Sequence, residues 1–232
     1  MLEQEISSFK AKHPDIKVLN GGDGCLVADW EYDKKLLPVR NYGLCDKHEA
    51  FYQEVLENND LDLLRNFCYP TICVSKNNAA CKEALAEIVL RNKDLTSCLR
   101  FNVYINNKLA NANVIADGIL LASNLGSTGY FKSVARTIFR HGLGLAFLNP
   151  TYSIPNLVLA LDDEVDIEVL RSTEIQLAWD KKLLDEKVQK NDVFHLQATR
   201  RHVTILGYDA FMCETCRRNR NSTVVNDSYM IV

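Results

Sequence analysis

The chain has 232 residues, 25% of which are charged, and its formal net charge is −3. A chain of this length buries roughly 70% of its unfolded surface, which is enough for one large domain or for two small domains that share a cleft. The slightly acidic balance excludes an overall basic footprint for nucleic acid, and no apolar run approaches the roughly 20 residues of a membrane span.

In chain order, residues 1–100 alternate segments of helical and of strand pattern, which predicts an α/β N-terminal domain. The segment 78–90 is assigned to a helix because Ala84, Leu85 and Ile88 recur at helical spacing. The predicted helices are residues 2–12, 47–58 and 78–90, and the predicted strands are residues 16–20 and a short one that begins at Pro38-Val39-Arg40 and ends at Asn41-Tyr42-Gly43.

From residue 101 onward the pattern changes to short strands bounded by turns, which predicts a β-rich, sandwich-like domain over residues 101–207. Residues 101–105 alternate and then turn at Asn106-Asn107, as a hairpin does. The other predicted elements are a buried strand over residues 114–122, a helix from Tyr130 to about Arg140, strands over residues 166–170, 175–178, 193–199 and 202–206, and a polar tail over residues 208–232.

The cysteines and the N-terminus both favour an intracellular protein. The segment Met1–Glu5 is acidic, unlike a secretory signal. Eight cysteines are scattered along the chain, and most are expected to be reduced and buried. Cys213 and Cys216 have half of a zinc-ribbon pattern without a matching second pair, so a reduced pair is favoured over a structural metal. We therefore expect a cytoplasmic protein without a metal-ligand set, a nucleic-acid partner or a membrane contact.

A glycine-rich loop, Gly21-Gly22-Asp23-Gly24, follows the predicted strand 16–20. Phosphate binding requires several backbone N–H groups close together with no Cβ in the way, and open α/β sheets bind ligands at the carboxyl ends of their strands. A carboxylate would repel phosphate, so Asp23 is expected to face an alcohol or a metal. Taken alone, such a tetrad is more often an ordinary β-turn.

A second small-residue loop, Gly126-Ser127-Thr128-Gly129-Tyr130, follows the apolar segment that begins after Asp117. Two such loops, each after a strand pattern, predict a nucleotide phosphotransferase. Structural roles remain open for each residue: Tyr130 as a core aromatic at a helix start, Thr128 or Ser127 as a helix cap, and Asp117 as a turn residue.

The order of these motifs resembles that of the NAD kinases. The resemblance rests on Gly21–Gly24, then Ala86-Glu87-Ile88-Val89, then the ungapped run from Asp117 to Tyr130, and it covers roughly residues 16–206. The segment Gly142–Pro150 and the strand pair around Trp179-Asp180-Lys181 agree with later parts of the family pattern. It implies an NAD kinase-like two-domain fold.

The resemblance implies phosphoryl transfer from ATP or polyphosphate to the adenosine-ribose 2′-hydroxyl of NAD. Asp23 would be the catalytic general base, Mg²⁺ would be carried by the donor phosphates, and the protein would be a homodimer or homotetramer. Asp117 would contact the nicotinamide end and the loop from Thr128 the adenine. The implied NAD-binding set is Asp23, Gly24, Glu87, Asp117, Thr128, Gly129, Tyr130 and Ser133, and the implied donor-phosphate set is Gly21, Gly22 and Asn41.

Three departures from the family pattern keep two alternatives open. Ala86 stands where the family has an Asn that grips the dinucleotide, Cys25 replaces a Thr, and few residues precede Asp23, so we expect the family's opening strand to be absent. A lost ligand hydrogen bond costs about 1–3 kcal/mol when its partner stays unpaired. The alternatives are a non-catalytic dinucleotide-binding module and a related Gly-Gly-Asp-Gly kinase that acts on a lipid alcohol.

Overall fold

The computed structural model describes residues 2–21, 24–39 and 54–208. They fall into two compact units, one containing the described residues before Pro70 and after Arg201, the other spanning Pro70–Arg201. The domain boundary expected near residue 100 lies inside strand β6 (Leu99–Ile105), within the second unit. No described helix is long and apolar enough to cross a membrane. Of the tail predicted over residues 208–232, residues 209–232 with Cys213 and Cys216 lie outside the described residues.

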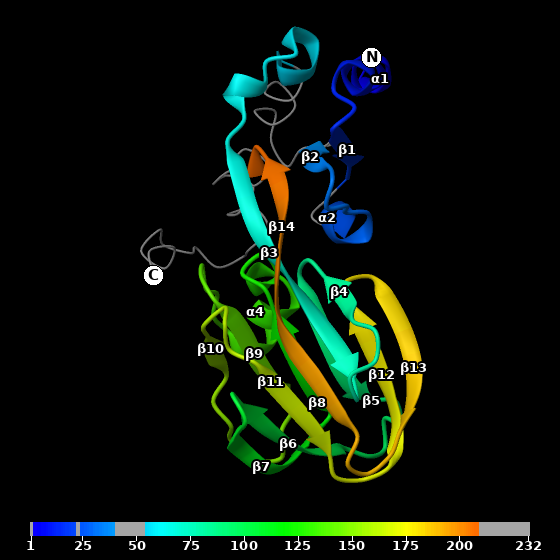
Figure 1. Cartoon of the computed structure of the whole chain (residues 1–232), viewed down its shortest axis with the longest axis vertical. Coiled ribbons are helices and arrows are strands. Elements are labelled where there is room, and N and C mark those ends of the chain that lie inside the picture. Colours follow the sequence, from blue (N-terminus) through cyan, green and yellow to red (C-terminus); the bar gives the residue numbers. More distant parts are fainter. Residues whose placement is uncertain (1, 22–23, 40–53, 209–232) are drawn as a thin grey trace. The chain divides into compact units, whose positions relative to one another are not determined.

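The first unit begins with the helix and strand that the sequence predicts (Figure 1). Helix α1 (Leu2–Lys12) buries Ile6 and Phe9, and it stops before His13, whose following Pro14 disfavours helical backbone. Strand β1 (Ile16–Asn20) pairs in parallel with β2 (Lys35–Val39). The strand expected to begin at Pro38 starts earlier, at Lys35, and its predicted part from residue 40 to residue 43 lies outside the described residues. The unit also contains α2 (Gly24–Ala28), a helical segment at residues 54–58 and a 3-10 turn, η1 (Leu61–Leu63).

The second unit is a β-sandwich (Figure 1). Its core lies between two sheets and includes Phe101 of β6 stacked on Phe147 of β9, with ring centroids 6.5 Å apart. One sheet has the order β10-β9-β8-β5-β12-β13, and the other includes β14-β11-β6-β7 with β3 and β4. The remaining bounds are β3 (Asn66–Lys76), β4 (Lys82–Ala84), β5 (Glu87–Asn92), β7 (Lys108–Ala116), β8 (Gly118–Ala122), β9 (Leu143–Leu148), β10 (Leu157–Leu159), β11 (Val165–Val169), β12 (Thr173–Trp179), β13 (Lys182–Val188) and β14 (Val193–Leu206).

Helix α4 (Tyr130–Ala135) covers the outer face of the six-stranded sheet. Phe131 of this helix packs against Phe139 and against the strands β5, β8 and β9. A Cβ at Gly144 of β9 would lie 2.5 Å from the Phe131 ring, so glycine is needed for this close approach. Because β8 is covered on both faces, all of its residues are buried and none alternates with polar positions.

The helix predicted over residues 78–90 is wrong, because this segment forms β4 and β5. Ile88 and Leu90 point into the sandwich core, whereas Val89 packs in the cluster under α4. A strand that is buried on both faces is a continuous apolar run, and over so few residues it cannot be told from a helix by periodicity.

Three other elements differ from the expected ones in length. The buried strand expected over residues 114–122 is divided at Asp117, since β7 belongs to one sheet and β8 to the other. The helix expected to reach Arg140 ends at Ala135, because Arg136 has left-handed backbone with φ 58°. The two strands expected over residues 193–199 and 202–206 form one strand, β14.

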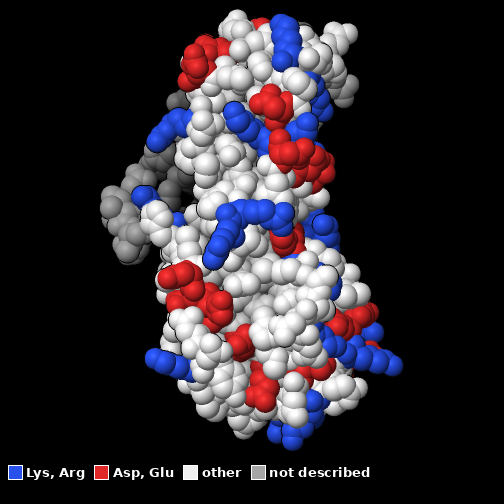
Figure 2. Space-filling view, in the orientation of Figure 1, with Lys and Arg blue, Asp and Glu red and all other residues white. Residues whose placement is uncertain are grey.

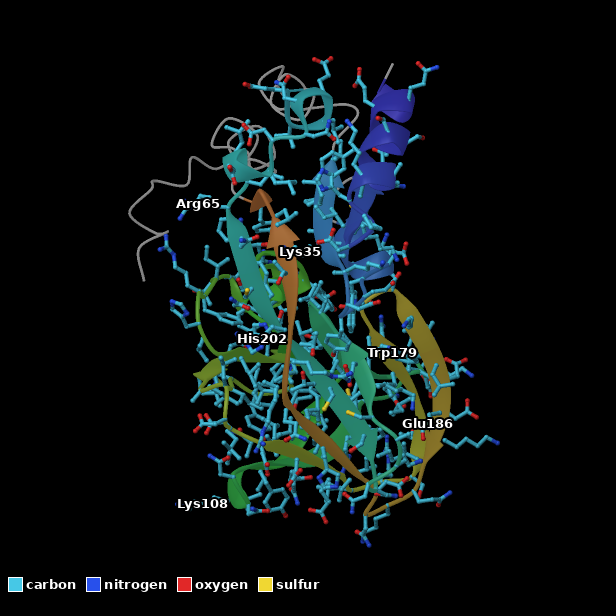
Figure 3. All side chains as sticks on the ribbon, turned by 45° about the horizontal axis from the view of Figure 1, so that its top comes forward. Lys35, Arg65, Lys108, Trp179, Glu186 and His202 are labelled. Carbon is cyan, nitrogen blue, oxygen red and sulfur yellow. The ribbon has the colours of Figure 1, made fainter. Side chains whose placement is uncertain are left out.

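Two hairpins follow the sequence pattern closely. The predicted turn at Asn106-Asn107 joins β6 to β7, and both residues have positive φ, 51° and 62°, as a type I′ turn requires. The second hairpin joins β12 to β13 through Asp180-Lys181. Figure 3 labels Trp179 at the end of β12 and Glu186 on β13. On the face drawn in Figure 2, acidic and basic side chains are interspersed, with no broad basic surface.

Candidate functional site

The glycine-rich tetrad connects β1 to α2, and only its two outer residues are described. Gly21 has φ 143°, a backbone conformation that favours glycine, and its N–H donates to the carbonyl of Val39 at 3.0 Å. Gly24 is the first residue of α2. Gly22, Asp23 and Asn41 lie outside the described residues.

The second loop is seated on the segment that precedes β5. The buried Ser123 donates its N–H to the carbonyl of Ala86 at 2.8 Å and its hydroxyl to the carbonyl of Leu85 at 2.6 Å. Gly126, the first residue of the 3-10 turn η2 (Gly126–Thr128), lies so close that an added Cβ would stand 2.2 Å from the Ala86 carbonyl oxygen. The glycine at this position is therefore required by packing against the chain.

Glu87 joins this segment to helix α4. Its half-buried carboxylate accepts a hydrogen bond from the backbone N–H of Tyr130, and its Oε2 lies 3.8 Å from where a Cβ on Gly129 would stand. Burial raises the pKa of Glu87 to about 6, the Tyr130 N–H lowers it in part, and the charge of Asp180 adds to the increase. Two predicted dinucleotide contacts, Glu87 and Tyr130, are thus in direct contact.

The raised pKa of Glu87 makes a testable contribution to stability. The folded state favours the protonated acid, so this contribution is complete below pH 4.5, the ordinary value, and is lost as the pH rises through about 6. Replacing Glu87 with Gln should therefore increase the free energy of unfolding at pH 7.5 by about 1–2 kcal/mol. Thermal unfolding of the wild type and of Glu87→Gln at pH 7.5 and at pH 4.5 measures this change in the free energy of unfolding. An equal effect of Glu87→Gln at both pH values would contradict the assignment.

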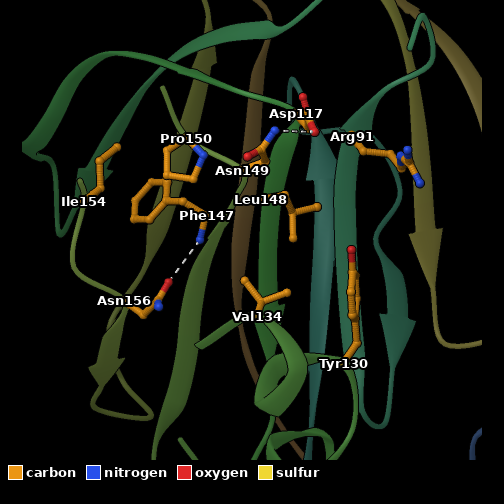
Figure 4. A pocket seen from close by; sticks show the side chains of 10 residues that line it. All are labelled: Arg91, Asp117, Tyr130, Val134, Phe147, Leu148, Asn149, Pro150, Ile154 and Asn156. Atoms are coloured by element: carbon orange, nitrogen blue, oxygen red, sulfur yellow. Dashed lines mark hydrogen bonds between the residues drawn. The ribbon is translucent and has the colours of Figure 1, made fainter. Parts of the chain in front are cut away.

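A pocket of about 440 Å³ opens beside α4, and it brings together Asp117 and Tyr130 (Figure 4). Tyr130 is 41% exposed, which rules out the core role left open for it, and its hydroxyl points toward the end of the pocket at which Asp117 and Arg91 lie. The pocket is lined by Arg91, Asp117, Tyr130, Val134, Phe147, Leu148, Asn149, Pro150, Ile154 and Asn156.

Asp117 is held in place by backbone and side-chain contacts. Its N–H donates to the Leu148 carbonyl at 2.9 Å, and its carbonyl accepts from Asn92 at 2.8 Å. Its carboxylate accepts from the Asn149 amide at 3.3 Å and from the Cys98 thiol at 3.9 Å. Neither contact saturates the carboxylate, which has about four lone-pair sites and therefore keeps capacity for a ligand.

Arg91 is a pocket residue that the sequence did not single out. It is exposed, and the described residues give its guanidinium no hydrogen-bond or ion-pair partner. It lies on β5 four positions after Glu87, so both side chains stand on one face of the sheet. That even spacing after a predicted ligand is the signal that could have identified Arg91.

Three other predicted ligands of the second unit lie near the pocket but do not line it. Thr128, Gly129 and Ser133 are exposed, the first two in the turn before α4 and Ser133 on α4 itself. Ser127 is buried, and its hydroxyl lies 2.9 Å from the Phe139 carbonyl oxygen, so it supports the loop from inside. Neither Thr128 nor Ser127 caps α4, whose N-cap is Gly129.

Comparison of the sequence with curated proteins finds relatives that are NAD kinases. No protein-family model matches the chain. An NAD kinase of Agathobacter rectalis is 30% identical over 166 residues, which are 66% of this chain and 58% of that protein. The chain spans about three fifths of the length of the curated relatives it matches.

Two solved structures share the fold. Yeast NADH kinase complexed with NADH superposes with a TM-score of 0.72 at 15% identity, covering 91% of this chain and 69% of that one. An NAD kinase from Archaeoglobus fulgidus in complex with ATP gives a TM-score of 0.65 at 15% identity, covering 90% of this chain and 85% of that one. These similarities confirm the fold that the motif order predicted.

Proposed function

Because the chain is similar to NAD kinases in sequence and in fold, we propose that it transfers a phosphoryl group from ATP or polyphosphate to the adenosine-ribose 2′-hydroxyl of NAD, which yields NADP. The observation that carries the proposal is that Asp117 and Tyr130 line the same pocket. The loop that leads to Tyr130 is hydrogen-bonded to residues 85–87, and Glu87 accepts a hydrogen bond from the Tyr130 N–H. In the family resemblance these residues are the dinucleotide contacts.

The proposed acceptor site has complementary groups for a dinucleotide. Asp117 accepts hydrogen bonds at the nicotinamide end, and Thr128, Gly129 and Tyr130 hold the adenine, with Ser133 one helical turn farther on. Glu87 and Gly24 complete the set. The exposed guanidinium of Arg91 offers several N–H donors to an anionic group of the ligand.

The donor side of the site rests on the glycine-rich tetrad. Gly21 and Gly22 admit the donor phosphates together with Asn41, and Asp23 stands against the acceptor hydroxyl as general base. Phosphoryl transfer passes through a loose transition state, so alignment of donor and acceptor matters more than early proton removal. Asp23 therefore orients the hydroxyl and receives its proton.

Mg²⁺ enters the proposal as an ion bound to the donor phosphates. In the described part of the chain no three His, Cys, Asp or Glu residues are grouped as metal ligands. Magnesium that is bound through substrate phosphates keeps several waters and needs only one or two carboxylates from the protein. The ion would neutralise charge that develops on the transferred group.

The test is to incubate the full chain with Mg-ATP or polyphosphate and either NAD or NADH, and to detect the phosphorylated product with an NADP-dependent dehydrogenase. NADP formation supports the proposal. Tight NAD binding without NADP would indicate a non-catalytic module, and phosphorylation of a lipid alcohol would indicate the related kinase class. The mass in solution tests the proposed homodimer or homotetramer, and cell fractionation tests the proposed cytoplasmic location.

Arg91 gives this proposal a residue-level prediction. Arg91→Ala should raise the Kd for NAD about tenfold, since a hydrogen bond to a charged group contributes about 1.5–3 kcal/mol and exposure reduces it. Arg100→Ala is the matched control, because Arg100 is also exposed in the second unit but does not line the pocket. Calorimetric titration measures both. Equal affinities of the two variants would remove Arg91 from the site.

A further inference from the structure

Asp180 binds three consecutive backbone N–H groups with one carboxylate. Its Oδ2 accepts from Leu85 at 2.8 Å, and its Oδ1 accepts from Ala86 at 2.9 Å and from Glu87 at 3.2 Å. Three successive N–H groups that converge in this way form a concave anion site in the backbone. Here the anion is a side chain 93 to 95 residues away in sequence.

The turn that carries Asp180 is itself attached to the same segment. Asp180 is the first turn residue of the β12–β13 hairpin and has φ 52°, and its N–H donates to the carbonyl of Glu87 at 2.9 Å. The neighbouring Trp179, labelled in Figure 3, pairs with Ile88 of β5. Both the backbone and the side chain of Asp180 therefore fix where β5 begins.

The carbonyl groups of residues 85 and 86 are bound by a different partner, the loop that begins at Ser123. Ser123 bonds the carbonyls of Leu85 and Ala86, and Gly126 packs against the latter. The N–H groups of residues 85–87 thus point to Asp180 and two of their carbonyls to the loop that leads to Tyr130. A shift of this segment would move Glu87 relative to the Tyr130 N–H that it binds.

We propose that Asp180 is a positioning residue for the dinucleotide site: it holds residues 85–87 so that Glu87 and the loop from Gly126 to Tyr130 keep one arrangement. The inference rests on the proposed function, since it assigns Glu87 and Tyr130 to the acceptor dinucleotide. Asp180 itself is not proposed to touch the ligand. The donor phosphates bind elsewhere in the proposal, so their affinity should not depend on Asp180.

Asp180→Gly is the principal test variant. Glycine adopts positive φ without strain, so the turn is kept while the carboxylate is removed. Asn191→Gly is the matched control, because Asn191 also has positive φ, 74°, and lies in the turn between β13 and β14 of the same unit. Asp180→Asn is the conservative variant: its amide oxygen still accepts from Ala86 and Glu87, while its NH₂ group opposes the Leu85 N–H.

Two measurements are made on the full chain. Hydrogen exchange of the peptide that spans residues 84–88 should become at least about tenfold faster in Asp180→Gly, because three charge-assisted bonds are lost, and should be unchanged in Asn191→Gly. The KM for NAD should rise about tenfold in Asp180→Gly with the KM for ATP within about twofold, and Asp180→Asn should fall between. General destabilisation would lower the active fraction without this selective change in KM.

The proposal is overturned if Asp180→Gly keeps the exchange rate of residues 84–88, or if its KM for NAD and its KM for ATP change together. If Asp180→Gly does not fold, hydrogen exchange of residues 84–88 and the two KM values are measured on Asp180→Asn instead, and the same outcomes support or overturn the proposal. A wild-type chain that makes no NADP would refute the proposed function, while hydrogen exchange and calorimetric NAD binding would still test whether Asp180 positions the segment.

Discussion

Asp23→Asn is expected to reduce NADP formation by about 10²- to 10⁴-fold while the protein remains folded, since general-base assistance is typically worth that much. The variant keeps the size of the side chain and its ability to orient a hydroxyl, but it cannot accept the proton. The rate is measured with saturating Mg-ATP and NAD in the dehydrogenase-coupled assay, and thermal unfolding verifies the fold.

Asp33→Asn is the control for this experiment. Asp33 is exposed in the same unit as Asp23, and no hydrogen bond or ion pair holds it among the described residues. It should retain full activity. Activity of Asp23→Asn within about fivefold of the wild type would exclude Asp23 as the general base, because the loss would fall below the range of that mechanism.

Gly126→Ala is expected to destabilise the second unit by about 3 kcal/mol and to lower its Tm by roughly 6–12 °C. The added Cβ would stand 2.2 Å from the carbonyl oxygen of Ala86 and 2.8 Å from its carbonyl carbon, so backbone must move. The loop would then lose its seat on residues 85–86, and NAD binding should weaken together with stability. Calorimetry of unfolding and of NAD titration measures the two effects.

Gly129→Ala separates this steric effect from a general effect of alanine in the loop. At Gly129 the nearest atom to an added Cβ is the Gly126 carbonyl oxygen at 3.3 Å, so the neighbouring backbone must shift by only a few tenths of an ångström. Gly129→Ala should therefore leave the Tm within a few degrees of the wild type, and a loss as large as that of Gly126→Ala would argue against the packing explanation.

The candidate site could be predicted from the sequence where its proposed ligand contacts come from a short local motif. The glycine loops, Asp117 and Tyr130 stood out in the sequence because few residue types would serve a nucleotide, and the structure places Asp117 and Tyr130 in the lining of one pocket. Arg91 and Asp180 were not assigned roles, because an arginine on a strand and an aspartate in a hairpin turn have ordinary explanations. The spacing of Arg91 from Glu87 becomes informative only once residues 87–92 are known to be a strand, and the proposed role of Asp180 depends on which strands are neighbours.

At Ala86 the sequence and the tertiary structure give different information. Ala86 stands where the family has an Asn, and from the sequence alone this difference indicates a lost ligand contact. In the structure the backbone of Ala86 still has a structural role, since its N–H bonds Asp180 and its carbonyl bonds Ser123. These main-chain bonds do not use the side chain of Ala86.

By itself, the amino-acid order determined the resemblance to the NAD kinases, the two glycine loops, the hairpin turn at Asn106-Asn107 and the β-rich second half, because these depend on residues that are close along the chain. Only the tertiary structure decided that residues 78–90 are strands and that Asp117 divides two sheets. It also decided that Asp180 binds the N–H groups before β5. The physical reason is that burial on both faces of a strand erases periodicity, and bonds between distant segments leave no local trace.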